Sequence, residues 1–145
     1  MAFRREVLLA VGGFDEFFDY NHDETDLIIR IMKTGGEIEY EDELLVYHFK
    51  AIGINRKSKY NINWYSDVKN NLYFGLKNGG DQFIVRLIRS FKRIFGSKGS
   101  FWILNKLLLE REISVFEYVR YMSKANMGLY AGLFGGIFSK RVLLS

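Results

Sequence analysis

The helical spacing of apolar residues between Asp81 and Phe95 constrains the fold more than any other feature of the chain. Apolar side chains recur every three or four residues on one face, and basic side chains occupy the opposite face. The apolar set is Ile84, Leu87, Ile88, Phe91, Ile94 and Phe95, and the basic set is Arg86, Arg89, Lys92 and Arg93. Such a helix covers a domain with its apolar face or lies on an anionic membrane surface. Packing on the domain is the first expectation, and peripheral membrane contact is the alternative.

Helical spacing and glycine stops delimit the other expected elements. Helices are predicted over residues 4–11, 23–33, 61–77 and 101–112, with a last one from Ser114 toward Phe138. Two short strands are predicted over residues 37–40 and 44–48, the second with an almost continuous apolar run.

The last predicted helix carries two further patterns. Ser114 followed by Glu117 is a capping box. A ladder of small residues, which permits close contact between helices, is formed by Gly128, Gly132 and Gly136. The uncharged run around the ladder, residues 125–139, is shorter than the roughly 20 residues that span a bilayer. We therefore expect a packing or interfacial helix.

Charge is distributed unevenly along the chain. Residues 1–50 hold twelve acids and five bases, a balance of −7, whereas residues 51–145 hold five acids and sixteen bases, a balance of +11. We therefore expect the two parts to have different partners. Nucleic acid is not an expected partner, because the acidic first third would repel phosphates. The absence of cysteine excludes disulfides and thiolate-bound zinc and fits a cytoplasmic location, with no secretory signal at the start.

A set of short motifs occupies residues 3–48. They are Phe3-Arg4-Arg5, Gly12-Gly13-Phe14-Asp15-Glu16, His22-Asp23-Glu24-Thr25-Asp26-Leu27, Arg30, Gly35 and His48. Their order and spacing resemble the second half of the GT-A domain of family 2 glycosyltransferases, where a GGFDE loop precedes an EDxD or DETD segment at the start of a helix. The resemblance covers residues 1–50 well and the helical remainder only loosely.

The resemblance implies an α/β fold. Residues 1–58 would form the acceptor-side, base-carrying end of a GT-A (nucleotide-diphospho-sugar transferase) sheet, and residues 59–145 a helical tail. The implied activity is inverting transfer of a sugar from a nucleotide-sugar donor to a saccharide or lipid-linked acceptor, as in polysaccharide biosynthesis for the cell envelope.

The resemblance also assigns roles to individual residues. Glu24 is the first candidate for the general base that takes the proton of the acceptor hydroxyl, and Asp23 is the second, because the common order Glu-Asp is reversed here. Substrate-binding roles fall on Gly12, Gly13, Asp15, Asp26 and Arg30. His48 is a weaker candidate, as a strand-end histidine near the diphosphate or the metal.

The donor side of such an enzyme is not found among these residues. A divalent metal, Mn²⁺ or Mg²⁺, is expected in the complete enzyme on an Asp-x-Asp motif, and none occurs in the sequence. The resemblance therefore implies that the donor-binding half lies in a preceding or separate segment, without which these residues are inactive. The expected place of action is the cytoplasm, at the inner face of the cell membrane.

Structural roles remain open beside the catalytic ones. Asp23 would also serve as a helix cap, and Asp26 and Arg30 would form an i,i+4 ion pair. His48 would also serve as a satisfied histidine at a strand end. The alternative function is that of a non-catalytic module that docks on a membrane surface or a protein through its basic helices.

Overall fold

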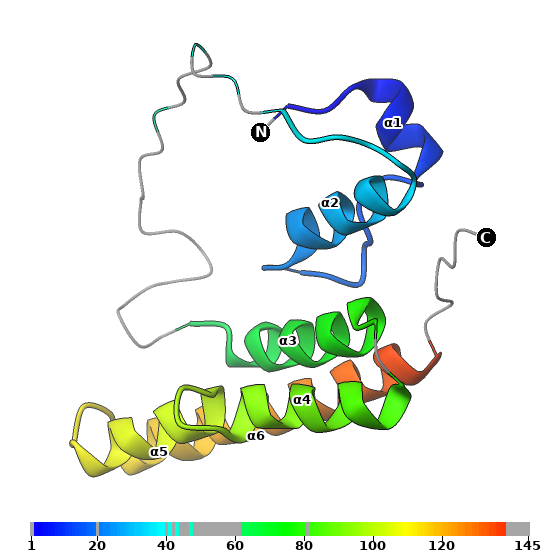
Figure 1. Cartoon of the computed structure of the whole chain (residues 1–145). Coiled ribbons are helices and arrows are strands. Elements are labelled where there is room, and N and C mark those ends of the chain that lie inside the picture. Colours follow the sequence, from blue (N-terminus) through cyan, green and yellow to red (C-terminus); the bar gives the residue numbers. More distant parts are fainter. Residues whose placement is uncertain are drawn as a thin grey trace.

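The structure is a computed structural model that describes residues 2–19, 21–39, 41, 43, 47, 62–80 and 82–138. It is mostly helical. The described residues form six helices (Figure 1), which are α1 (Arg5–Ala10), α2 (Asp23–Lys33), α3 (Trp64–Asn78), α4 (Phe83–Phe95), α5 (Ser100–Leu109) and α6 (Val115–Phe138). The predicted helices are confirmed, with ends shifted by a few residues.

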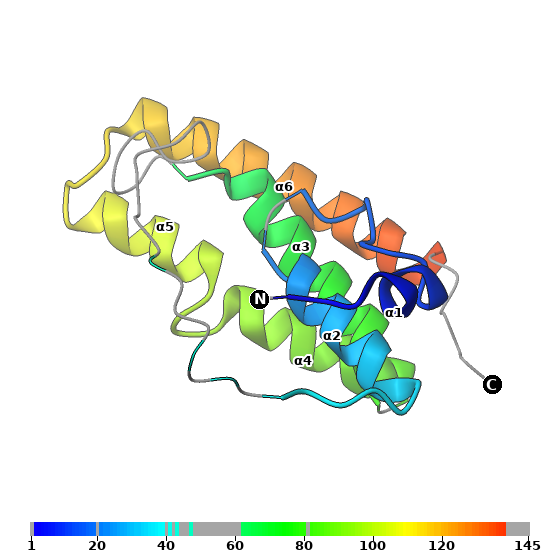
Figure 2. The same ribbon diagram turned by 90° about the horizontal axis from the view of Figure 1, so that it is seen from above.

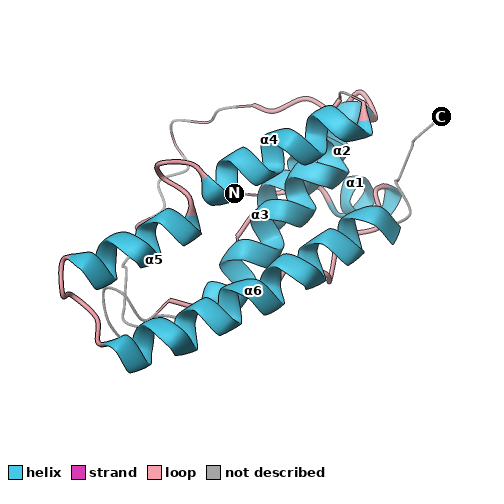
Figure 3. Cartoon of the chain, turned by 90° about the horizontal axis from the view of Figure 1, so that it is seen from below, coloured by secondary structure: helices cyan, strands magenta, loops and turns pink. Residues whose placement is uncertain are grey.

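Helix α3 lies at the centre of the arrangement. Helices α1 and α2 lie on one side of it, and α4 and α6 lie on the other (Figure 1). Seen from below, α3 runs between α4 and α6, and α5 links the far ends of those two helices (Figure 3). The view from above shows α2 over α3, with α4 and α6 at opposite edges (Figure 2). Every other layer of the described structure is therefore built on α3.

Two faces of α3 serve different neighbours. Trp64, Val68, Leu72 and Leu76, spaced by four residues, are buried in the apolar core that α3 shares with α4, α5 and α6. A second stripe at the same spacing holds Lys69, Tyr73 and Lys77. Its polar atoms reach the loop and helix on the other side of α3. The mixed polarity of the α3 sequence thus reflects two interfaces.

A smaller apolar cluster holds α1 against α2. Val11, Leu27 and Ile31 are buried, and three further apolar side chains pack against them, namely Phe3, Val7 and Leu8. Burial of this few side chains gives a short two-helix unit little stability of its own. The unit therefore depends on its contacts with α3.

The predicted α/β sheet is wrong, because the described residues form no sheet. Residues 37–39 have no strand pairing, and Ile38, the apolar residue expected to anchor the first strand, is 65% exposed. A strand is stable only when neighbours pair its backbone and cover a face. Of the second predicted strand, 44–48, only Tyr47 is described; it is exposed and outside any strand.

Both patterns predicted for α6 are confirmed. The Ser114 hydroxyl accepts a hydrogen bond from the Glu117 N–H at 3.2 Å, and the Glu117 carboxylate accepts one from the Ser114 N–H at 2.9 Å. Gly132 lies so close to α3 that a Cβ there would stand 2.5 Å from the Lys69 carbonyl oxygen.

Among the described residues no helix is long and apolar enough for a bilayer span.

Candidate functional site

The predicted helix stop at Gly12-Gly13 is confirmed. Both glycines have positive φ, +77° and +72°, which residues with a Cβ resist. The Gly13 N–H donates to the Leu8 carbonyl at 2.8 Å and closes the end of α1. The chain is thereby turned into the loop 14–22, which carries the aromatic and acidic residues of the GGFDE motif.

Asp15 fixes the loop to α3. One oxygen, Oδ1, accepts a hydrogen bond from the Phe17 N–H at 2.9 Å, and Oδ2 accepts from the Tyr73 hydroxyl and from Lys77 Nζ, each at 2.6 Å. Burial alone would raise the pKa of Asp15. The hydrogen bonds from Lys77, Tyr73 and Phe17 and the charge of Lys77 outweigh burial and hold this pKa below the ordinary 3.8.

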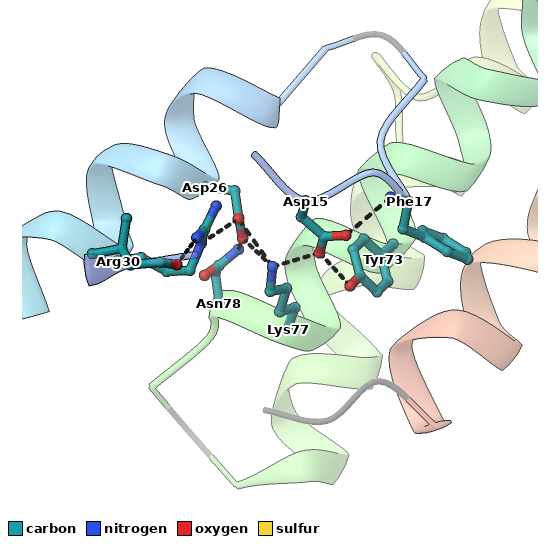
Figure 4. Close-up of polar contacts among 8 residues, drawn as sticks. Asp15, Phe17, Asp26, Arg30, Tyr73, Lys77 and Asn78 are labelled. Atoms are coloured by element: carbon teal, nitrogen blue, oxygen red, sulfur yellow. Dashed lines mark hydrogen bonds and ion pairs between the residues drawn. The ribbon is translucent and has the colours of Figure 1, made fainter. Parts of the chain in front are cut away.

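Asp26 meets the same lysine from α2. Lys77 Nζ lies 2.8 Å from Oδ1 and 2.9 Å from Oδ2 of Asp26, whose side chain is fully buried. Asn78 donates to Oδ1 at 2.8 Å, and Arg30 donates to Oδ2 at 2.9 Å. Figure 4 shows Lys77 between the two aspartates, with Asn78 beside it below Asp26 and Arg30 on the far side of Asp26.

We call Asp15, Asp26, Arg30, Lys77 and Asn78 the Lys77 cluster. Two carboxylates are balanced by two cations, and a buried group of charges is tolerated when it is paired and hydrogen-bonded in this way. The predicted i,i+4 pair of Asp26 with Arg30 is confirmed as part of it. Three of the predicted substrate-binding side chains are thus brought together and bonded to protein groups.

Arg30 extends the cluster to α1. Its Nη1 donates to the Val11 carbonyl oxygen at 2.6 Å, next to the glycine turn. The carbonyl groups at the end of a helix have no partner inside the helix, so a cation here satisfies one of them. Arg30 therefore couples the end of α1, the buried Asp26 and, through it, α3.

A second set of contacts fixes the later part of the loop. Lys69 Nζ lies 2.6 Å from a carboxylate oxygen of Asp19 and donates to the Phe17 carbonyl oxygen at 2.6 Å. Ser66 donates to the same Asp19 oxygen at 3.0 Å. The loop is thus bonded at Asp15, Phe17 and Asp19 to one stripe of α3.

His22 sets the start of α2. It adopts the left-handed conformation with φ of +67°, stacks on Phe74 at 4.6 Å between ring centroids, and its Nε2 lies 3.1 Å from Asn71 Oδ1. His22 is also the N-cap residue, without a side-chain cap bond. The predicted cap at Asp23 is therefore wrong by one residue, because Asp23 is the first residue of the helix.

Asp23 and Glu24 remain open in the first turn of α2. Glu24 is exposed and Asp23 is half-buried. Within the part of the chain that the structure describes, neither carboxylate has a hydrogen bond or an ion pair. The first turn of a helix favours negative charge, because its N–H groups point outward without partners. Among the described residues, no group binds this pair of carboxylates, in contrast to Asp26, two residues after Glu24.

The described ranges contain no group of three or more histidine and acidic side chains that would hold a metal ion. His48, the weaker metal candidate, lies outside the described residues. The proposed chemistry below therefore contains no step through a metal.

Sequence reasoning missed the partners on α3. Lys77 stands 51 residues from Asp26 along the chain, and neither Lys77, Lys69 nor Tyr73 belongs to the recognised motifs. One signal was present: three long polar side chains at four-residue spacing on a helix that also has a full apolar stripe. Because the two halves of the chain also carry opposite net charges, this polar stripe is typical of a helix that pairs with acidic residues of the same chain.

Comparison of the chain with protein-family models, with curated proteins and with solved structures gave no match.

Proposed function

We propose that the described residues up to 39, held on α3, form the acceptor-side part of an inverting sugar transferase, with Glu24 as the general base and Asp23 as the second choice. One observation carries the proposal. Of the three acids in the Asp23-Glu24-Thr25-Asp26 segment, Asp26 is buried against Lys77 and Arg30, whereas the other two lie open at the helix start. The segment therefore has a structural acid and an available acidic pair.

The chemistry needs an available carboxylate at a fixed position. As the acceptor oxygen attacks the anomeric carbon, its proton moves to Glu24, and the bond from that carbon to the nucleoside diphosphate breaks with its electron pair on the diphosphate. Attack from the side opposite the leaving group inverts the anomeric centre. A positioned base of this kind contributes about 10² to 10⁴ in rate.

The Lys77 cluster supplies the position. Asp15 and Asp26 fasten the GGFDE loop and helix α2 to the same lysine, so the helix start cannot shift relative to α3 without breaking buried ion pairs. Rigid support of this kind is what orientation of an acceptor beside a base requires. We assign Asp15, Asp26 and Arg30 to positioning, and the turn at Gly12 and Gly13 to the approach of the acceptor.

The donor belongs to another segment in this proposal. A nucleotide sugar would be bound by residues outside those described, and the acceptor would be a saccharide or a lipid-linked saccharide in the cytoplasm. Calorimetry with a panel of nucleotide sugars, with and without Mn²⁺, tests the division on the chain itself. We expect no binding; clear metal-dependent binding would show a complete donor site and overturn the division.

Activity tests the base. In the transferase assembled with its donor-binding segment, Glu24→Gln is expected to lower kcat by about 10² to 10⁴ with KM for the acceptor little changed. Glu16→Gln, at an exposed acid of the neighbouring loop, is the matched control and should retain full turnover. Near-normal turnover of the Glu24 variant would remove Glu24 as the base, and Asp23→Asn would then be the decisive variant.

A further inference from the structure

Helix α4 packs on α3 through its less apolar side. Its buried residues are Arg86, Ser90 and Ile94, spaced by four. Helix α3 presents Gly75 and Gly79 to them: a Cβ at Gly75 would collide with Ser90 Oγ, and one at Gly79 would stand 2.5 Å from Arg86 Cδ. The Arg86 guanidinium also donates to the Gly79 carbonyl oxygen at 3.1 Å. Gly75 and Gly79 of α3 thus allow the polar side of α4 to pack closely against α3.

Part of the predicted apolar face of α4 does cover the domain, because Ile94 is buried and Leu87 and Phe91 pack against the core, but the rest of the stripe is left on the surface. Ile84, Ile88 and Phe95 are 66%, 53% and 47% exposed. With Phe91 they fall within an arc of about 60° at 100° per residue, about 130° away from the buried side. Phe91 stacks on Phe95, and Phe95 stacks on Phe101 at 4.5 Å, which joins the end of the stripe to the buried start of α5.

The stripe forms an open hollow at the edge of the molecule. Its lining residues all belong to α4 and the turn after it, namely Leu87, Ile88, Phe91, Lys92, Phe95 and Gly96. Figures 2 and 3 both show α4 at the edge of the helical layer opposite α6. In the described structure this helix face is therefore accessible to a large, flat partner.

Cations border the stripe. Lys92 lines the hollow and Arg89 follows it around the exposed side of the helix, whereas Arg93 lies almost opposite the stripe and lines a second pocket with Asp67. From residue 82 to residue 109 the sequence has six basic residues and no acidic one. Lys98 and Lys106 in this range are also exposed. Within this range of the sequence, the charges that accompany the apolar stripe are therefore all positive.

The exposed apolar stripe and the basic residues beside it together indicate which kind of partner binds this face of α4. A second copy of the chain would bring an equally basic surface against it, so like charges would oppose association through this face. A neutral apolar segment would cover the stripe but would bring no negative charge to Lys92 beside it. An anionic lipid surface matches both features, because acyl chains receive the apolar stripe while phosphate groups pair with lysine and arginine.

We propose that α4 binds the interface of an anionic membrane, with Ile84, Ile88, Phe95 and the partly exposed Phe91 directed to the acyl boundary and Arg89 and Lys92 to the phosphates. The helix lies in the plane of the membrane and does not cross it. The inference is independent of the proposed transfer reaction, because it uses none of the residues assigned to the base or to its support.

Sedimentation with vesicles tests the inference on the full chain. We expect binding to vesicles of phosphatidylcholine with phosphatidylglycerol, at least tenfold weaker binding to vesicles of phosphatidylcholine alone, and partial release by salt. No binding to the anionic vesicles would overturn the inference. Equal binding to both vesicle types would overturn the role given to the cations.

Two variants locate the surface. Ile88→Glu adds a charge to an exposed position of the stripe and is expected to reduce binding at least tenfold; Leu9→Glu makes the same type of change at an exposed position of α1 and should bind as the parent does. Lys92→Gln with Arg89→Gln should weaken only the binding to anionic vesicles. Circular dichroism confirms that each variant is folded.

The remaining outcomes are also decisive. If Ile88→Glu binds as tightly as the parent, the stripe is not the lipid-binding surface. If the parent forms a dimer in solution that Ile88→Glu dissociates, while vesicle binding is unaffected, the occupant is a second copy and the lipid inference fails. Transfer activity is not part of these readouts, so the two proposals fail separately.

Discussion

Helix α3 is held on its two sides by contacts of opposite kinds. Toward α6 the helices approach through glycines and an apolar core, and the Cβ-free surface of Gly132 rests on the α3 backbone. Toward the loop and α2 the contact consists of paired charges: Asp15, Asp26 and Lys77. The first interface is specified by shape and the second by charge.

The difference has consequences for how each interface responds to change. A shape-specified contact is insensitive to pH and intolerant of added volume. A buried charge-specified contact tolerates neither the loss of one partner nor a change in protonation. The following predictions separate the two, beginning with the largest expected effect.

Lys77→Met should be the most damaging substitution. Methionine keeps most of the apolar stem of lysine but leaves Asp15 and the fully buried Asp26 without their shared cation. Removal of one partner from a buried pair typically lowers the free energy of unfolding by about 3 to 5 kcal/mol. Urea unfolding measures the loss. Lys106→Met, which removes an exposed pair with Glu110, is the control and should cost less than about 1 kcal/mol; equal losses would contradict a charge-specified interface.

Asp15→Asn should lower stability by about 2 kcal/mol at neutral pH, because it weakens the bonds with Lys77 and Tyr73. The pKa of Asp15 in the folded chain lies below the ordinary 3.8, so its contribution is present above that pH and disappears as the pH falls through the folded value. The stability difference between parent and variant should therefore narrow below about pH 4. Thermal unfolding across this range checks it, and a constant difference would argue against the ionised form as the source.

Gly132→Ala tests the interface specified by shape. Alanine raises helix propensity by about 1 kcal/mol, but its Cβ would stand 2.5 Å from the Lys69 carbonyl oxygen and 3.1 Å from Leu72 Cβ. Displacement of the backbone should outweigh the gain and give a net loss of about 1 to 2 kcal/mol. Gly80→Ala, where nothing lies within 4 Å of the new Cβ, should change stability little. A stabilised Gly132→Ala protein would mean that the two helices separate easily.

Glu24→Gln should have the smallest effect on stability. Glu24 is exposed and bonded to none of the described residues, so the free energy of unfolding should change by less than about 0.5 kcal/mol. Thermal unfolding of the same preparation used for kinetics provides the measurement. A loss similar to that of Asp15→Asn would place Glu24 among the structural acids and would weaken its assignment as a base.

The helices were predictable because their signals are local. Glycine pairs, the Ser114 capping box and apolar spacing fix where a helix begins and ends without information from the rest of the chain. The same kind of evidence led to the wrong prediction of a sheet, since a strand such as the one predicted over residues 37–40 forms only if another segment pairs with it. Periodicity gave only part of the buried side of α4: it included Ile94 but not Arg86 and Ser90, whose burial depends on Gly75 and Gly79 of another helix.

The candidate site was predictable only in part. The resemblance assigned substrate-binding roles to Asp15, Asp26 and Arg30, and the local i,i+4 rule gave the Asp26–Arg30 pair. It did not separate Asp26, which is buried, from Glu24, which is exposed, because that distinction is made by Lys77 and Asn78 from a helix distant in sequence.

The Lys77 cluster also determines where the chain can be divided. A cut anywhere between residues 39 and 62 would leave the GGFDE loop and α2 on one piece and their counter-ions Lys69 and Lys77 on the other. The acidic segment and α3 therefore have to be kept or replaced together when parts of the chain are exchanged. A chimera that borrows the acidic segment needs the matching α3 with it, and a variant library for this region should vary Asp15, Asp26 and Lys77 jointly.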